Sequence, residues 1–178
     1  MVAEELTRRW GLGRARERFR GRIAEGRAGA PEPGRAPPPR VAVLCPQTYM
    51  NDAGRSVGPA RGALKVALER VLVVHDEIDL PFGDVRTRLG GGLAGHNGLK
   101  SLRRELGSAD FMRVRVGVGR PDSTDPEIVS AHVLGRFNEG EANVRELVED
   151  ACRHVEAALL GDAEGDGSEP AEPGGVAG

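Results

Sequence analysis

Cysteines, long apolar runs, targeting segments and internal repeats are scarce or absent in this 178-residue sequence. The two cysteines, Cys45 and Cys152, have no CxxC neighbour, so neither a disulfide framework nor a zinc site is supported, and both thiols are expected to be reduced and buried. No apolar run is long enough to cross a bilayer, and the first residues, MVAEELTRRWG, do not resemble a signal peptide. These absences favour a cytoplasmic protein with no membrane partner.

The charge is unevenly distributed along the chain. The last 18 residues carry five acids and no base, and this composition predicts a disordered acidic tail over 161–178. Removing these five of the 27 acids leaves 22 against 25 bases. Residues 86–120 are more strongly basic, with eight Arg or Lys against two acids. Such clustering favours a polyanionic partner, because bases that bind phosphates release counterions. The alternative is an ordinary solvated basic face.

Hydrophobic periodicity predicts one α/β domain over residues 1–160, with helices on the faces of a sheet. A Pro/Gly loop interrupts the domain at 26–39. The apolar run at 71–75 is typical of a strand covered on both faces. Helices are expected at 2–10, 55–67, 97–107 and 140–160, and strands at 17–26, 40–45, 71–75, 84–89 and 111–119.

The glycine run GGGLAG, residues 90–95, matches the G-x-G-x-x-G pattern between a strand and a helix. A dinucleotide site is disfavoured because the preceding strand carries Arg86 and Arg88, no acid lies near position 115 to bind a ribose, and no Lys-Ser/Thr follows. The glycines are therefore expected to permit a tight turn, or close approach to a ligand, before Asn97 caps the next helix.

The segment HDEID, residues 75–79, follows a buried strand. A metal site is disfavoured because His75 and Glu77 point to one side of an extended chain and Asp76 to the other. Asp76 lies at the carboxyl end of the strand, where open α/β sheets bind ligands. A carboxylate there needs a partner, and a catalytic histidine is one candidate. The alternative is that Asp76 accepts hydrogen bonds from loop amides.

Residues 46–54, PQTYMNDAG, also follow a strand directly and are expected at the same edge. Asn51 can orient a carbonyl or hydroxyl group, and Tyr49 offers a face for stacking a base or ribose. Taken singly, both are ordinary turn residues. His96 begins a helix and could touch a ligand, but it is expected to lack a carboxylate partner. His154 is expected at the surface, and His132 begins a short apolar stretch.

Four motifs in order, PQTYMN, HDEIDLPFG, GGGLAGHNGLKSL and FMRVRVGVGRP, resemble bacterial peptidyl-tRNA hydrolases over about residues 2–160. The resemblance implies a single globule with a twisted mixed sheet, and hydrolysis of the ester joining a peptide to the ribose of tRNA. It also implies a monomer that needs neither metal nor organic cofactor. By the same resemblance, Asp76 keeps a general-base histidine in its basic form, the basic band contacts phosphates, and tRNA is bound by Tyr49, Asn51 and Asn97.

The sequence departs from the family pattern at its start. In the family, an apolar strand, a Gly-Asn-Pro-Gly turn and the catalytic histidine precede the helix that residues 2–10 resemble. None of the four histidines here matches that base, so we expect Met1 to be internal to a longer protein and the 178-residue chain to hydrolyse its substrate poorly. The alternatives are a non-catalytic tRNA-binding module on the same fold and, resting on GGGLAG alone, a nucleotide-dependent oxidoreductase.

Overall fold

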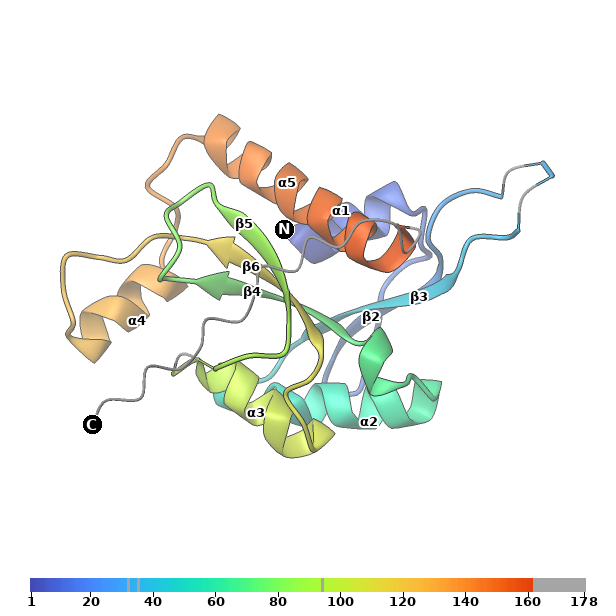
Figure 1. Cartoon of the computed structure of the whole chain (residues 1–178), viewed down its shortest axis with the longest axis horizontal. Coiled ribbons are helices and arrows are strands. Elements are labelled where there is room, and N and C mark those ends of the chain that lie inside the picture. Colours follow the sequence, from blue (N-terminus) through green and yellow to red (C-terminus); the bar gives the residue numbers. More distant parts are fainter. Residues whose placement is uncertain (32, 35, 94, 162–178) are drawn as a thin grey trace, which may run out of the picture.

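Strands and helices alternate along the part of the chain that the computed structural model describes, which is residues 1–161 without positions 32, 35 and 94 (Figure 1). The expected acidic tail therefore lies, from residue 162 onward, outside the described residues. The α-helices are α1 (Val2–Arg9), α2 (Gly54–Leu64), α3 (Asn97–Leu106), α4 (Pro126–Leu134) and α5 (Glu141–Leu160), and the 3-10 helices are η1 (Met50–Asp52) and η2 (Leu68–Arg70). The strands are β1 (Arg16–Arg18), β2 (Gly21–Arg27), β3 (Arg40–Pro46), β4 (Leu72–Glu77), β5 (Val85–Leu89) and β6 (Met112–Gly117).

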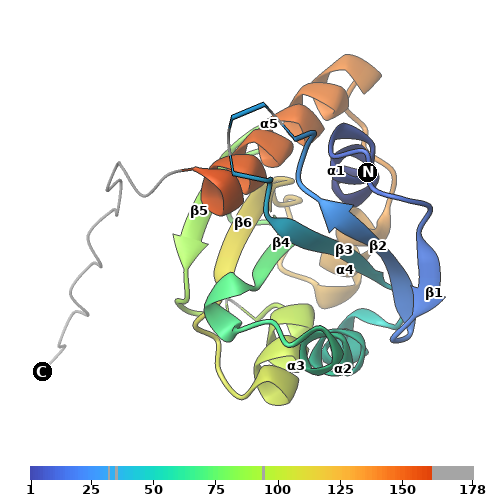
Figure 2. The same cartoon turned by 90° about the vertical axis from the view of Figure 1, so that its right-hand side faces the viewer.

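The strands form two three-stranded sheets, so the expectation of one mixed sheet is wrong for these residues. The first sheet, β1-β2-β3, is antiparallel. The second has the order β4-β6-β5, with β4 parallel and β5 antiparallel to β6, so it alone is mixed. β3 and β4 lie next to each other in Figure 2, but each is the last strand of its own sheet. The two sheets are separate because no strand within the described residues hydrogen-bonds to both of these edges.

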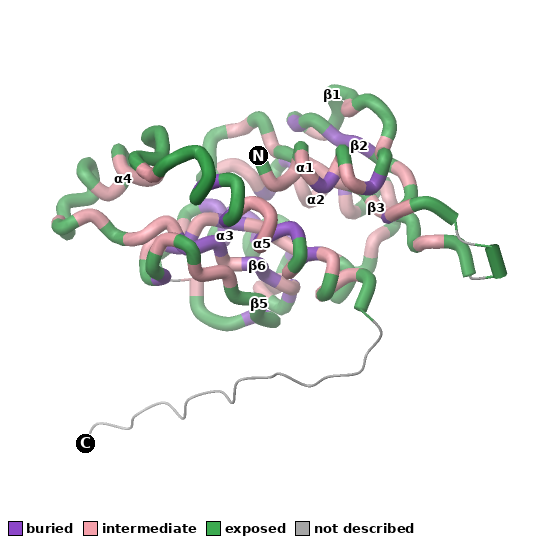
Figure 3. The backbone as a smooth tube through the Cα atoms, turned by 90° about the horizontal axis from the view of Figure 1, so that it is seen from above, coloured by how far each residue is buried: buried purple, intermediate pink, exposed green. Residues whose placement is uncertain are grey.

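Helices cover both faces of the second sheet, as the sequence predicted (Figure 2). α5 packs on one face, with α1 against α5 and β3, and the apolar cluster there contains Leu72 and Val74 of β4. α2 and α3 lie on the other, where a second cluster contains Val73. Alternate residues of β4 thus face different clusters, which confirms that this strand is covered on both sides. Buried positions concentrate in the layers between helices and strands (Figure 3).

The strand expected at 17–26 is in fact a hairpin. Arg18 pairs with Gly21, so Phe19 and Arg20 alone form the turn between β1 and β2. Both have left-handed backbone angles, with φ of 55° and 53°, as a two-residue type I′ turn requires. Neither residue is a usual choice for that turn, and the alternation of polar and apolar residues runs across it, so the pattern suggested one continuous strand.

The cysteines and the helix cap also differ in part from expectation. Both cysteines are free, and Cys152 is buried, but Cys45 is exposed at the end of edge strand β3, so the prediction was wrong for that residue. The N-cap of α3 is His96, while Asn97 is the first residue of the helix.

Among the described residues, no helix is both long and apolar enough to span a membrane.

Candidate active site at the carboxyl end of β4

Asp76 lies near the carboxyl end of β4, the position that the sequence predicted for a ligand site. Its neighbours in the strand, His75 and Glu77, are buried, and Glu77 receives a hydrogen bond from Arg115 of β6 (Nε to Oε2, 3.0 Å). The Asp76 side chain itself is about one-third exposed. The strand thus presents one partly accessible carboxylate beside two buried polar neighbours.

His96 is the partner of Asp76, contrary to the expectation that this histidine lacks a carboxylate. Its Nε2 lies 3.6 Å from Asp76 Oδ1, an ion-pair distance slightly too long for a hydrogen bond. Burial, the largest single influence, raises the pKa of Asp76, but the interactions with His96, its own backbone amide and His75 together hold the pKa below its usual value of 3.8. The contact between the end of β4 and the start of α3 therefore favours an ionised Asp76.

The start of α3 fixes the orientation of the His96 ring. The backbone N–H of Leu99 donates to Nδ1 of His96 at 3.3 Å, so Nδ1 is unprotonated and the ring hydrogen is on Nε2, facing Asp76. Gly98 makes room for the ring, since a Cβ there would lie 2.9 Å from His96 Cε1. The sequence HNG thus supplies a cap, a helix start and space for the ring.

His75 packs against His96 from the buried side. The two rings meet edge to face, with centroids 5.0 Å apart and planes at 82°. His75 Nδ1 donates to the backbone carbonyl of Asp76 at 2.7 Å, so its lone pair is on Nε2, which is buried without a hydrogen-bond partner among the described residues. Burial is the main reason that the pKa of His75 lies below 6.5. His75 is thus a neutral buried residue at pH 7.

The three predicted tRNA-binding residues lie on elements that flank this pair, without hydrogen bonds from their side chains to Asp76 in the described structure. Asn97 directly follows His96 in α3. Asn51 is exposed in η1, which packs along α3 and brings Met50 close to Gly98. Tyr49 is 85% exposed just before η1. The amides and the phenol border the site and remain open to a ligand.

Three glycines, at positions 90, 91 and 95, lie between β5 and α3 in turn conformations, as the sequence predicted. Gly90, Gly91 and Gly95 have positive φ angles of 59°, 89° and 76°, which other residues rarely adopt. Gly91 also borders a pair of arginines, because a Cβ there would lie 2.6 Å from Arg88 Nε and 3.1 Å from Arg113 Nη2. The glycines therefore serve both the turn and the close approach of two cations.

Arg113 is unusual in this arrangement because it is a buried cation that pairs with no carboxylate in the described part of the chain. Only 3% of it is exposed, and although Nη1 donates to the Gly92 carbonyl at 2.9 Å, Nε and Nη2 have no partner among the described residues. Burial, followed by the charges of Arg88 and Arg115, lowers its pKa. Sequence reasoning found the basic band but could not locate this buried member, since alternation in β6 does not distinguish a buried arginine from an exposed one.

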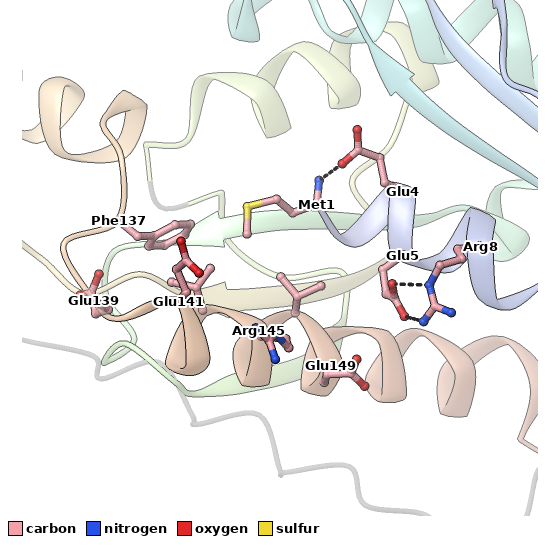
Figure 4. Close-up of a pocket in the computed structure, with 11 residues that line it drawn as sticks. Met1, Glu4, Glu5, Arg8, Phe137, Glu139, Glu141, Arg145 and Glu149 are labelled. Atoms are coloured by element: carbon pink, nitrogen blue, oxygen red, sulfur yellow. Dashed lines mark hydrogen bonds and ion pairs between the residues drawn. The ribbon is translucent and has the colours of Figure 1, made fainter.

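A separate hollow of about 610 Å³ lies between α1, the start of α5 and Phe137 (Figure 4). Its apolar floor is bordered by five glutamates, some of them engaged by Arg8 or by the chain amino group. This acidic border does not suit a phosphate ligand. Neither Asp76 and His96 nor the residues that flank them line the hollow.

Comparisons with known proteins agree on one family. A family model described as peptidyl-tRNA hydrolase matches residues 1–168. A peptidyl-tRNA hydrolase of Rhodopseudomonas palustris strain BisB18 is 43% identical over 163 residues, covering 91% of this chain and 75% of the relative. A peptidyl-tRNA hydrolase of Syntrophotalea carbinolica is 41% identical over 160 residues, covering 89% of this chain and 78% of the relative. A crystal structure of peptidyl-tRNA hydrolase from Acinetobacter baumannii is 31% identical with a TM-score of 0.74, covering 90% of this chain and 77% of that one.

Proposed function

The chain belongs to the peptidyl-tRNA hydrolase family, and from this premise we propose that it acts on peptidyl-tRNA, hydrolysing the ester between the peptide and the ribose. The observation that carries the proposal is the Asp76–His96 contact at the carboxyl end of β4, next to Asn97. A partly exposed carboxylate with a low pKa can stabilise a protonated base during water attack. The exposed Tyr49 and Asn51 are available to bind the tRNA end.

The basic surface beside the glycine turn supports a tRNA substrate. Arg88 is exposed, Arg113 is buried next to it, and both border Gly91. Two cations that approach each other without a carboxylate between them repel, and a phosphate group bound there would relieve that repulsion.

The general base is the part of the mechanism that these residues do not supply. His96 has Nδ1 occupied by the Leu99 amide and its Nε2 hydrogen directed at Asp76, so neither nitrogen is free to accept a proton from water. His75 has a free lone pair but is buried. His132 contacts the carbonyls of Val118 and Gly119, and His154 contacts Thr87, away from Asp76. We therefore propose that the 178-residue chain hydrolyses peptidyl-tRNA slowly.

Within the described residues, β3 and β4 are each paired with a strand on one side only, and these edges support a further strand at this position. Both edges expose backbone N–H and C=O groups that an inserted strand would pair. We propose that a segment before residue 1 supplies this strand together with the base histidine, and that the complete protein is a cytoplasmic monomer. The codons upstream of Met1 test this directly: a Gly-Asn-Pro-Gly turn followed by histidine is expected, and its absence would contradict the proposal.

Hydrolysis of an N-blocked aminoacyl-tRNA by the 178-residue chain and by the longest natural form is the decisive experiment. Loss of a general base costs roughly 10²- to 10⁴-fold, so the longer form should be faster by at least that range. Ordinary turnover by the 178-residue chain would overturn the assignment of a missing base. Salt-sensitive tRNA binding without hydrolysis by either form would favour the alternative of a non-catalytic tRNA-binding module.

The phosphate contacts are tested separately by binding. Arg88→Gln should weaken tRNA binding and reduce the dependence of log affinity on log salt by about one. The matched control is Arg145→Gln, which removes an exposed arginine from α5 beside the acidic hollow and should leave the affinity unchanged. Equal effects of the two substitutions would indicate attraction by overall charge instead of a defined phosphate site.

A further inference from the structure

Two nitrogens of one imidazole perform different tasks at position 96. Nδ1 accepts the Leu99 amide and so caps α3, while Nε2 carries a hydrogen and faces Asp76 at 3.6 Å. An N-cap is usually filled by Ser, Thr, Asp or Asn, whose short side chains reach the backbone but nothing beyond it. A histidine at the cap adds a second, distal N–H on the same rigid ring.

We propose that His96 is a positioning residue for Asp76, with the α3 N-cap selecting the tautomer that directs an N–H at the carboxylate. This inference rests on the proposed function in one respect: the proposed function gives Asp76 the role of stabilising a base histidine. In this arrangement the helix start selects the tautomer. The Leu99 amide donates to Nδ1, so the ring hydrogen is on Nε2, which faces Asp76. His75 completes the support by packing edge to face on the ring.

The surroundings of Asp76 leave His96 as the group best placed to determine its ionisation. The strand partner of Asp76 across β6 is Val116, which is uncharged. His75, the neighbouring titratable group in β4, directs its own N–H at the Asp76 backbone carbonyl and not at the carboxylate. Without the Nε2–H of His96, burial, which is already the largest influence on the pKa of Asp76, would be opposed only by the Asp76 backbone amide and by His75, and the carboxylate would become harder to ionise.

Two substitutions separate capping from positioning. In His96→Asn the side-chain oxygen takes the place of Nδ1 and can cap α3, but the side chain is too short to reach Asp76. In His96→Gln the amide nitrogen extends to about the place of Nε2 and can donate to Asp76, but glutamine is a poor N-cap. If His96 only caps the helix, Asn should replace it well and Gln badly. If His96 positions Asp76, Gln should preserve the titration of Asp76 and Asn should not.

The measurement is the carboxyl carbon titration of Asp76 by NMR in the 178-residue chain, with thermal unfolding recorded alongside. We expect His96→Asn to raise the titration midpoint of Asp76 above that of the parent chain while its melting temperature stays close to the parent value. We expect His96→Gln to keep the low midpoint despite a lower melting temperature. The proposal is overturned if Asp76 titrates in His96→Asn as in the parent, or if both variants raise the midpoint equally.

This titration is independent of catalysis, so it can fail or succeed separately from the proposed function. In the longest natural form, a positioning role also predicts that His96→Asn lowers kcat about 10-fold or more with little change in KM, the magnitude usual for a residue that orients a functional group through one contact. A shifted midpoint without any hydrolysis would retain the positioning of Asp76 and reject the hydrolase assignment. Unchanged kcat in an active enzyme would reject the positioning role.

Discussion

His75 couples protonation to stability because it is a histidine held neutral inside the fold. Burial lowers its pKa below the ordinary 6.5, more than the Asp76 carbonyl and the nearby carboxylates raise it. The unfolded chain therefore binds a proton at this site at higher pH than the native state does. It follows that the stabilisation is complete only well above pH 6.5 and is lost as the pH falls through 6.5 toward the lower pKa of the native state.

We predict that the free energy of unfolding decreases from pH 7 to pH 5, and that His75→Gln flattens this dependence. Urea unfolding at pH 5, 6, 7 and 8 measures it. Between pH 7 and 8 only a minor fraction of the unfolded chains protonates His75, so parent and variant should differ much less in slope there than between pH 7 and 5, which serves as an internal control. Asp76 has a lowered pKa as well, but it starts from 3.8 and acts at lower pH. An unaltered slope in His75→Gln between pH 7 and 5 would contradict the prediction.

At the level of single residues, sequence reasoning located the carboxylate but not its surroundings. Asp76 could be placed because a polar residue directly after an apolar strand marks the end of that strand. Its contact with His96 could not be predicted, because it depends on how the chain after β5 returns to bring the start of α3 beside β4. The signal that was available is the sequence HNG at a helix start, in which a capping histidine next to glycine has room to fold back.

Among the elements, the β1–β2 hairpin is under backbone strain that two substitutions should remove. Phe19 and Arg20 both adopt left-handed angles, each at a cost of roughly 1 kcal/mol for a residue with a side chain. Replacing Phe19 by asparagine and Arg20 by glycine supplies the residues that type I′ turns favour, at the loss of a weak contact between Arg18 and the Phe19 ring.

We expect the double substitution F19N/R20G to increase the free energy of unfolding by about 1 kcal/mol, measured by urea denaturation. The control is the reverse order, F19G/R20N, which relieves the same angles with a less favoured pair and should stabilise less. A loss of stability in both variants would indicate that the cation and ring contact contributes more than the turn strain removes.

Elements with a clear apolar period could be predicted, and those without one could not. In α3 the residues Leu99, Leu102 and Leu106 are all buried, and they recur at helical spacing, so this helix was found. Helix α4 was missed because PEIVSAHVL has no polar face to contrast with an apolar one. Its start did carry a signal, since Asp125 caps the helix by accepting from the Glu127 amide and Pro126 follows it directly.

At the scale of the whole molecule, the boundary between the two sheets should govern which amides exchange with solvent. β2 and β6 are central strands, hydrogen-bonded on both sides, whereas β3 and β4 are edges. We predict that amide hydrogen exchange is slow throughout β2 and β6 and faster at the outward amides of β3 and β4. In the longest natural form, the edge amides should become as protected as the central ones. Equal protection in both forms would argue against an inserted strand.

The division into two sheets was beyond the reach of sequence reasoning for a physical reason. Most strands were recognisable by their own composition, but the pairing of strands depends on the positions of their neighbours, which composition does not specify. The continuous apolar run of β4 indicated two covered faces, which the structure confirms, but it carries no information about whether the edges of the strand are paired.

The two sheets are held together chiefly by side chains. Val41 and Val43 of β3 share an apolar cluster with Leu72 and Val74 of β4, over which Trp10 and the rest of α1 pack. Apolar contact of this kind weakens as temperature falls, unlike the hydrogen-bonded ladders inside each sheet. Cooling should therefore weaken this junction more than it weakens the hydrogen-bonded ladders inside each sheet.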